Sequence, residues 1–390
     1  MHNPYLLPIA KQIDVDIQYG NGCFLYDTNG KAYLDCLSGM GVNALGHKHP
    51  SIQKAIQTQM ERNLHLFGYF QQDVHVDLAK ALVENTHFDR VFYSNSGTEA
   101  MEAALKLVKK WGNQKGKNEI ICFHGGFHGR TIGGLSITAQ ASKQEPFQPL
   151  LPGIKAIEKS IEAISESISE KTTAVVLELI TGEGGIFPTS EAFISALVEL
   201  RQKYGFLIII DEIQAGIGRT GTLFSYMHYN FQPDLITVAK GIGGGLPLGV
   251  LMIPEHLANV FSAGEHGSTF GGNPLACATG NAVLNEIIKH GLLDHVAAVS
   301  EYFFKKLHEL KSEYPIIKDI RGKGLMIGVE IGDIASKVMN SCIKNGLFLN
   351  ATQGHTIRFL PPLIISKDEV DQAIEIFKTS LNAHLDEAET

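Results

Sequence analysis

Two apolar runs near the middle of the chain each end at a single charged residue. Phe206 to Ile210 is wholly apolar and stops at Asp211, and Asp234 to Ala239 is nearly apolar and stops at Lys240. Continuous β-branched runs of this length are typical of strands buried on both faces, as in a parallel sheet covered by helices. Ligands of such sheets lie outside the carboxyl ends of the strands. A buried acid and a buried amine at that edge are the minimal set for a Schiff-base cofactor with a pyridine nitrogen.

Similar patterns divide the rest of the chain into strands and helices. Residues 20–37 alternate about a Thr-Asn-Gly turn, which predicts a hairpin. Residues 154–170 have the composition of an acidic, amphipathic connector. The other expected strands are 91–94, 120–123, 173–179, 316–320, 325–331, 346–350 and 356–360. The expected helices are 50–60, 96–111, 191–204, 275–290, 296–311, 333–345 and 367–384.

Composition narrows the class of protein. The 390 residues are long for one core, so we expect two tightly joined domains. The net charge of −8, without a basic stripe, argues against a nucleic-acid partner. Five scattered cysteines, never spaced as Cys-x-x-Cys, fit reduced thiols in the cytoplasm better than disulfides or a zinc site. The N-terminus lacks the apolar core of a signal peptide, and no run approaches a membrane span.

Several polar, glycine-rich segments are candidates for binding. Ser96 and Glu99 have the spacing of a capping box, and the Ser-Gly-Thr turn would also direct backbone N–H groups toward a phosphate. From this segment alone, a well-capped helix is the better interpretation. In the segment 124–136, the glycines between His124 and His128 make a helix improbable there. We therefore expect a loop that carries Phe127 and Arg130 into the cleft, against the alternative of a plain surface loop.

Two other patterns are weaker. Residues 216–221 match G-x-G-x-x-G, but the glycines start five residues beyond the strand and no long helix follows, which argues against a nucleotide site. His47 and His49 have no third ligand at a suitable spacing, so a loop role is favoured over a metal site.

Eight motifs in one order resemble those of a known family. The chain resembles the class III, pyridoxal-phosphate-dependent aminotransferases of fold type I, most closely the acetylornithine aminotransferases. The resemblance runs nearly from end to end, and is carried by LDCLSGMGVNALGHKHP, SNSGTEAMEAALKL, FHGRTIGGLS, DEIQAGIGRTG, PDLITVAKGIGGGLPLG, HGSTFGGNPLACA, RGKGLMIGVE and IRFLPPL. It implies a large α/β domain at 51–285 with a mostly parallel seven-stranded sheet between helices. Residues 1–50 and 286–390 would form a smaller α+β domain.

The resemblance assigns the cofactor site. Lys240 would bind the aldehyde of pyridoxal 5′-phosphate and later move the substrate proton, and Asp211 would keep the pyridine nitrogen protonated. Ile213 and Phe127 would lie against the two faces of the ring, and Gln214 would hold its phenolic oxygen. The phosphate would be bound by Ser96, Gly97, Thr98 and, from the partner subunit of a homodimer with active sites at its interface, Thr269.

The resemblance also assigns the substrates. Arg358 would bind the α-carboxylate of glutamate or 2-oxoglutarate, and Arg130 would bind the distal carboxylate. Glu183 would pair with Arg358 while an acylornithine reacts, against the alternative of a free surface salt bridge between them. Ser268 would complete the substrate site, and no metal is expected.

The implied activity is transfer of the terminal amino group of N2-acetylornithine, or of another acylornithine such as N2-succinylornithine, to 2-oxoglutarate in arginine biosynthesis. Alternatives are an ornithine or 4-aminobutyrate aminotransferase, an acylated diaminopimelate as donor, a related aminomutase, or a non-catalytic relative. The non-catalytic alternative predicts loss of Lys240 or Asp211, and both are present. The chain departs from the family pattern at Glu178–Glu183 and at Leu66–Gln72, so the acyl group stays open.

Overall fold

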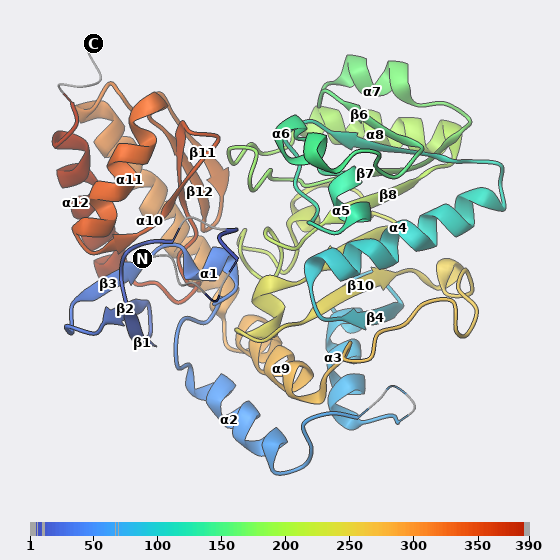
Figure 1. The fold of residues 1–390 in the computed structure, drawn as a ribbon, viewed down its shortest axis with the longest axis horizontal. Helices are drawn as coiled ribbons and strands as arrows, with labels where there is room; N and C mark the ends of the chain where they lie inside the picture. The colour runs from blue at the N-terminus through green and yellow to red at the C-terminus, as the bar shows by residue number, and fades with distance from the viewer. Residues whose placement is uncertain (1–4, 6, 10–11, 67, 69, 386–390) are drawn as a thin grey trace.

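A seven-stranded sheet forms the centre of the molecule in the computed structural model, which describes residues 5, 7–9, 12–66, 68 and 70–385 (Figure 1). The strand order is β4-β10-β9-β8-β7-β5-β6. Strand β10 alone runs opposite to the other six strands, so the sheet is mostly parallel, as predicted. The strands are β4 (Arg90–Ser94), β5 (Glu119–Phe123), β6 (Ile154–Ile157), β7 (Thr172–Leu177), β8 (Leu207–Asp211), β9 (Leu235–Val238) and β10 (Gly249–Ile253).

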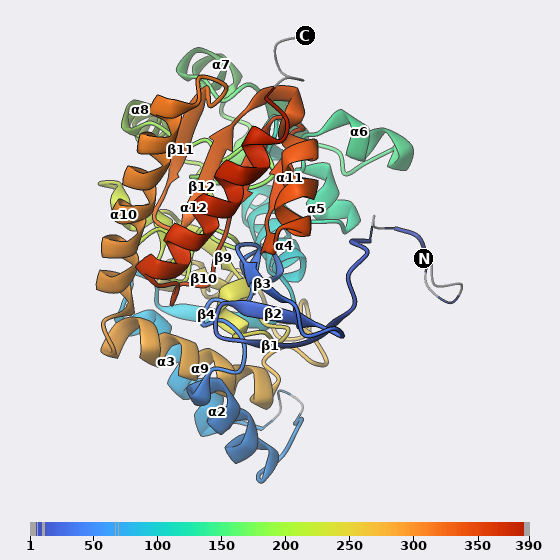
Figure 2. The same ribbon diagram turned by 90° about the vertical axis from the view of Figure 1, so that its left-hand side faces the viewer.

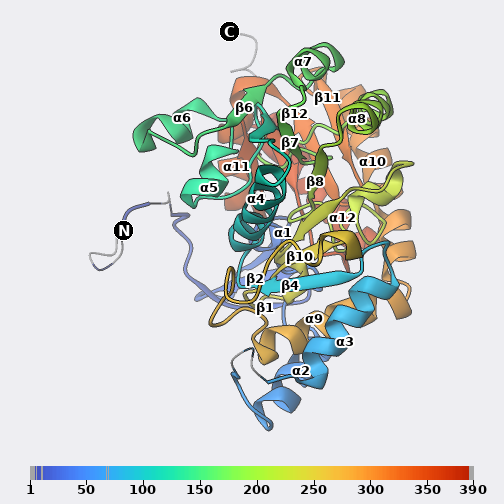
Figure 3. The same cartoon turned by 90° about the vertical axis from the view of Figure 1, so that its right-hand side faces the viewer.

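Both faces of this sheet are buried, which explains the continuous apolar runs. Ile209 of β8 packs in a cluster with residues of α4 (Gly97–Asn113), a helix that crosses one face of the sheet in Figure 3. Its neighbours Ile208 and Ile210 belong to the core that contains α8 (Glu191–Tyr204). Successive side chains of a strand point to opposite faces, so a strand covered on both sides cannot alternate apolar with polar residues.

Two smaller sheets lie beside the main one. The first has the order β11-β12-β15-β14, and the second has the order β1-β2-β3-β13, in which β13 pairs in parallel with β3. The N-terminal hairpin therefore shares a sheet with the C-terminal chain, while the division into domains at residues 50 and 285 stays a prediction. The strands are β1 (Ile17–Asn21), β2 (Phe24–Asp27), β3 (Ala32–Asp35), β11 (Asp319–Lys323), β12 (Met326–Glu330), β13 (Leu347–Phe348), β14 (Asn350–Thr352) and β15 (Thr356–Phe359).

The remaining helices cover these sheets. Figure 2 shows α10 (Leu292–Glu313), α11 (Ala335–Lys344) and α12 (Lys367–Asn382) side by side on the smaller part of the molecule. Helices α2 (Pro50–Met60), α3 (Asp73–Glu84) and α9 (Pro274–Lys289) pack together at the other end. Within the described residues, we find no helix that combines the length and the apolar character needed to cross a lipid bilayer. The short helices are α1 (Ser38–Gly41), α5 (Ile132–Ser136), α6 (Ala141–Gln144) and α7 (Ile161–Ser167).

Some sequence expectations were wrong. Residues 154–170 were expected to form a connector, but they contain strand β6 and helix α7. The strand expected at 316–320 is β11, which begins only at Asp319 and continues through the polar Arg-Gly-Lys segment. Register against β12 fixes this strand, so hydrophobicity could not locate it. Helix α3 and strand β10 were not predicted.

Candidate active site

A cavity of about 440 Å³ lies at the carboxyl edge of the main sheet. Five segments that are far apart in the sequence meet there: the start of α4, the loop after β5, the loop after β7, the end of β8 and the end of β9. The predicted residues that line it are Ser96, Gly97, Thr98, Phe127, Arg130, Glu183, Asp211, Ile213, Gln214 and Lys240.

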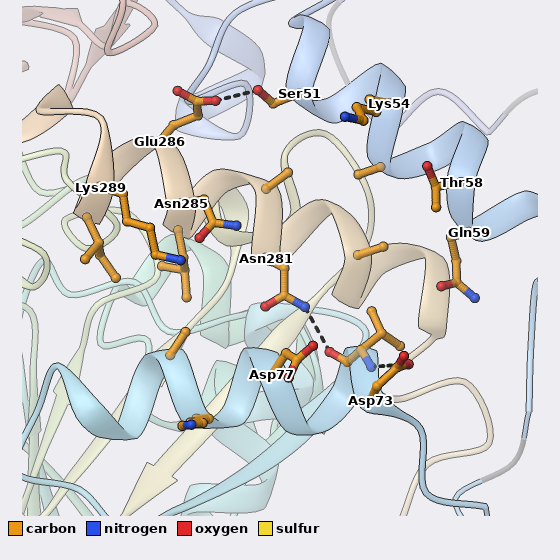
Figure 4. Close-up of a pocket in the computed structure, with 18 of the residues that line it drawn as sticks. Ser51, Lys54, Thr58, Gln59, Asp73, Asp77, Asn281, Asn285, Glu286 and Lys289 are labelled. Carbon is orange, nitrogen blue, oxygen red and sulfur yellow. Dashed lines mark hydrogen bonds between the residues drawn. The ribbon is translucent and has the colours of Figure 1, made fainter.

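A larger hollow of about 720 Å³ lies elsewhere, between α2, α3 and α9 (Figure 4). Its walls mix polar and apolar side chains, with Ser51 donating a hydrogen bond to Glu286 and Asn281 donating to the carbonyl of Val74. None of the predicted site residues lines it, so its size does not make it the candidate site.

Asp211 and Lys240 lie at the ends of adjacent strands, as the apolar runs predicted. Asp211 closes β8 in register with Thr237 of β9, and Lys240 follows β9 at a positive φ of 49°. Burial, followed by the charge of Arg358, lowers the pKa of the Lys240 amine to about 8. An amine with a pKa near neutrality can both accept and release a proton at the pH of the cell.

His128 orients Asp211, and sequence reasoning missed this role. Its Nδ1 lies 2.7 Å from Asp211 Oδ2, and both side chains are buried. Asp211 Oδ1 accepts a second hydrogen bond from the backbone N–H of Ile213, at 3.0 Å. Burial opposes protonation of the His128 ring, but the bond to Asp211 prevails and raises its pKa. The available signal was a histidine in a loop that follows a strand at the ligand edge.

The first turn of α4 faces the cavity with its N-terminal end. Ser96 is the N-cap, and its Oγ accepts a hydrogen bond from the N–H of Glu99 at 3.3 Å. The Glu99 carboxylate accepts from the N–H of Asn95 at 2.6 Å, one residue before the cap. The first N–H groups of a helix lack partners within the helix, and the helix dipole favours an anion beside them. A Cβ at Gly97 would lie 2.7 Å from Ile213 Cδ1, so a larger residue would displace Ile213 from the cavity wall.

Arg358 and Glu183 form an ion pair. Nη1 of Arg358 lies 2.8 Å from Glu183 Oε1 and also donates to Gln214 Oε1 at 3.1 Å. Arg358 is fully buried, while the side chain of Glu183 is 30% exposed. Burial would raise the pKa of Glu183, but the adjacent Arg358 lowers it overall, so the acid is charged at neutral pH. This pair is therefore not a free surface salt bridge.

Arg130 and Phe127 extend from the same loop. The guanidinium carbon of Arg130 lies 5.5 Å from the centre of the Phe127 ring, and Arg130 is exposed at the cavity wall. The loop is fixed by Glu178, whose buried carboxylate accepts from the N–H of Phe127 at 3.0 Å. The expectation of a loop that carries both residues to the cleft agrees with these positions.

Ser268 and Thr269 lie outside the cavity wall of this chain. Ser268 Oγ accepts a hydrogen bond from the side-chain amide of Asn95 at 3.0 Å, and Thr269 is exposed. Thr269 was expected to act in the partner subunit, and that role stays a prediction. His47 binds Asp35 at 2.9 Å and His49 caps α2, and no metal-ligand cluster occurs among the described residues.

The chain is similar to known proteins along nearly its whole length. The family model for class-III aminotransferases matches residues 8–381. The chain belongs to the class-III aminotransferases. It is 42% identical to the acetylornithine aminotransferase of Clostridium acetobutylicum over 386 residues, covering 98% of this chain and 100% of the relative. It is 43% identical to that of Aquifex aeolicus over 383 residues, covering 97% and 100%.

Solved structures confirm the fold type I architecture of this aminotransferase. The ornithine aminotransferase of Toxoplasma gondii ME49 superposes with a TM-score of 0.93 at 32% identity, covering 98% of this chain and 94% of the other. The N-acetylornithine aminotransferase of Stenotrophomonas maltophilia K279a superposes with a TM-score of 0.84 at 29% identity, covering 96% and 97%.

Class-III aminotransferases are transaminases that depend on pyridoxal 5′-phosphate. The residues of this chain fit that cofactor. The cavity has a buried amine of lowered pKa, a carboxylate held by His128, and a helix N-terminus suited to a phosphate. When bound, the cofactor supplies a protonated pyridine ring that withdraws electrons from the carbon that loses a proton.

Proposed function

We propose that this aminotransferase moves the terminal amino group of N2-acetyl-L-ornithine to 2-oxoglutarate, giving the semialdehyde and glutamate, in arginine biosynthesis. Another N2-acylornithine, such as N2-succinylornithine, is included in the proposal. The observation that carries it is the ion pair between Glu183 and Arg358, which neutralises a fully buried arginine. Arg358 itself does not line the cavity but lies directly behind its wall, where it donates to Gln214 and to the carbonyl of Gly182. Similarity over the full length to relatives named acetylornithine aminotransferase supports it.

We assign the cofactor contacts residue by residue. Lys240 binds the aldehyde carbon, and Asp211 binds the ring nitrogen. The first turn of α4, with Ser96, Gly97 and Thr98, binds the phosphate, and Gln214 binds the phenolic oxygen. Ile213 and Phe127 hold the ring from its two sides. Positions on the cavity wall support each of these assignments.

The two half-reactions place opposite demands on Arg358. An acylornithine reacts at its terminal amine, so its carboxylate lies far from the chemistry, and a free Arg358 beside the reacting carbon would favour the wrong end of the molecule. Glutamate and 2-oxoglutarate react at the carbon next to a carboxylate, which a guanidinium binds with two parallel hydrogen bonds. Glu183 therefore pairs with Arg358 while an acylornithine reacts. It releases Arg358 when glutamate or 2-oxoglutarate binds.

Arg130 should serve both substrates through their distal carboxylates. We expect Arg130→Ala to raise the KM for acetylornithine and for 2-oxoglutarate by about ten- to a hundredfold, as loss of one charge-assisted pair implies. Initial-rate kinetics on both substrates measures the effect. Lys143→Ala is the matched control, because Lys143 also lies near the Phe127 ring, at 5.9 Å, and carries the same charge. A change for only one substrate would refute the shared anchor.

A panel of amino donors with 2-oxoglutarate tests the function. Acetylornithine and succinylornithine should exceed ornithine and 4-aminobutyrate in kcat/KM. Ornithine carries a charged α-amino group beside the carboxylate that Arg130 would bind, and 4-aminobutyrate is one carbon too short to place its carboxylate at the same distance from the reacting amine. Preference for ornithine would support the alternative suggested by the TM-score of 0.93 to an ornithine aminotransferase. Preference for 4-aminobutyrate would refute both.

A second copy of this chain completes the site in our proposal. Leu64, Phe70 and Phe270 are large apolar residues that are 56%, 61% and 60% exposed. A homodimer would cover these residues. A monomeric mass for the holoenzyme in solution would contradict the homodimer.

The cysteines bear on the cellular compartment. All five are free and buried, which supports a reducing compartment such as the cytoplasm.

A further inference from the structure

One row of residues crosses the sheet β11-β12-β15-β14. Register places Arg321, Gly328, Arg358 and Asn350 directly opposite one another on consecutive strands. Opposed residues of antiparallel strands project from the same face of the sheet. Gly328 therefore leaves a gap in the row between two arginines.

The loop that carries Glu183 lies on this row. Arg358 Nη1 donates to the carbonyl of Gly182 at 3.0 Å, and Arg321 Nε donates to the carbonyl of Gly185 at 2.7 Å. The guanidinium carbon of Arg321 also lies 3.9 Å from the centre of the Phe187 ring. The two arginines thus hold the two ends of the segment 182–187.

Ile186 occupies the gap between them. It is fully buried, and a Cβ built on Gly328 would lie 2.9 Å from Ile186 Cβ and 3.2 Å from its Cγ1. Alanine at position 328 would therefore force Ile186 to move, since a contact of 2.9 Å between two Cβ atoms is below the van der Waals limit. The side chain of Ile186 therefore fills the space that Gly328 leaves by having no side chain.

The backbone of Ile186 is strained. Its φ is 62°, which is rare for a β-branched residue because Cβ approaches the backbone. Such a conformation persists only where the surroundings impose it. The N–H of Ile186 donates to the carbonyl of Thr181 at 2.8 Å, and Thr181 Oγ1 accepts from the N–H of Phe187 at 3.1 Å. These hydrogen bonds and the packing of Ile186 against Gly328 hold the loop in one conformation.

We propose that Ile186 and Gly328 are positioning residues that keep the Glu183 loop where Glu183 covers Arg358. The proposal rests on the function proposed above for Glu183 and Arg358. Gln353 adds a third attachment, since its Nε2 donates to the carbonyl of Glu183 at 2.8 Å. With its backbone held at Gly182, Glu183 and Gly185, the loop leaves only the partly exposed side chain of Glu183 to turn away when a substrate α-carboxylate arrives.

Gly328→Ala tests the proposal in the holoenzyme. The two half-reactions are followed separately in single turnovers, through the visible spectrum of the bound cofactor. We expect kcat/KM for acetylornithine to fall about tenfold, because Glu183 covers Arg358 less well, and kcat/KM for glutamate to change less than about twofold. Ile186→Ala removes the other member of this contact. It should also lower the ratio of kcat/KM for acetylornithine to kcat/KM for glutamate.

Val329→Ala is the matched control. Val329 is the next residue of β12, is fully buried, and points to the opposite face of the sheet. It should lower the thermal unfolding temperature without changing the ratio of the two half-reactions. An equal fall of both half-reactions in Gly328→Ala and Ile186→Ala would overturn the proposal. If Gly328→Ala fails to fold, Ile186→Ala decides.

Failure of the proposed function gives a different result. In that case the wild-type enzyme does not accept an acylornithine, and the ratio is measured with the terminal-amine donor that it does accept, against glutamate. If Ile186→Ala leaves this ratio unchanged, the positioning role is wrong, whichever donor is used. If Ile186→Ala shifts the ratio, the result supports the positioning role.

Discussion

Lys240→Ala should abolish transamination, with turnover falling by at least about 10⁴-fold. No other lysine lines the cavity within the part of the chain that the structure describes. In the role that we propose for Lys240, the substitution removes the covalent attachment of the cofactor together with the base that moves the substrate proton. Burial and the charge of Arg358 keep the pKa of this amine at about 8, and water cannot replace a group so placed and so tuned.

Lys159→Ala is the matched control for this experiment. Lys159 is a second lysine whose pKa burial lowers to about 8, but its Nζ donates to the carbonyl of Glu178 at 3.2 Å and does not line the cavity. The control should keep most of the activity. Mass analysis after borohydride reduction should place the cofactor on the peptide that contains Lys240. Turnover in Lys240→Ala, or a label on Lys159, would refute the assignment.

The ends of buried strands were predictable from the sequence, and so were the residues that follow them. Apolar runs stop where the sheet meets the cavity, and this pattern locates Asp211 and Lys240 without any family resemblance. The physical reason is that a strand covered on both faces excludes charge until its end. Strand β10 escaped prediction because five residues between a glycine-rich turn and a proline carry too little pattern.

Contacts between distant segments were beyond the reach of periodicity. The bond of His128 to Asp211 spans 83 residues, and that of Glu183 to Arg358 spans 175. Periodicity says which face a side chain takes, but only the packing of loops decides which two loops meet. Family resemblance suggested the second pair and missed the first. The packing of Ile186 against Gly328 depends on the register of β12 with its neighbour β11. Local sequence patterns did not determine that register.

Asp211→Asn should lower kcat by about 10³-fold while leaving the cofactor bound. The amide keeps the size of the side chain but removes the negative charge that, in our proposal, stabilises a protonated ring nitrogen, so the ring would withdraw electrons less well. His128→Asn should have a smaller effect, about tenfold, because it loosens the orientation of Asp211 and leaves its charge in place. Steady-state kinetics with acetylornithine and 2-oxoglutarate measures both effects.

Glu212→Gln is the matched control, since it neutralises the adjacent acid on the same stretch of chain. Glu212 is fully buried away from the cavity, and its carboxylate accepts from the N–H groups of Ser225 and Tyr226, each at 2.9 Å. Burial raises its pKa to about 7, so a neutral side chain costs less at this position than at an exposed glutamate. This control should retain most of the activity. If Glu212→Gln lost as much kcat as Asp211→Asn, the effect would be one of buried charge in general, and the specific role of Asp211 at the ring nitrogen would be wrong.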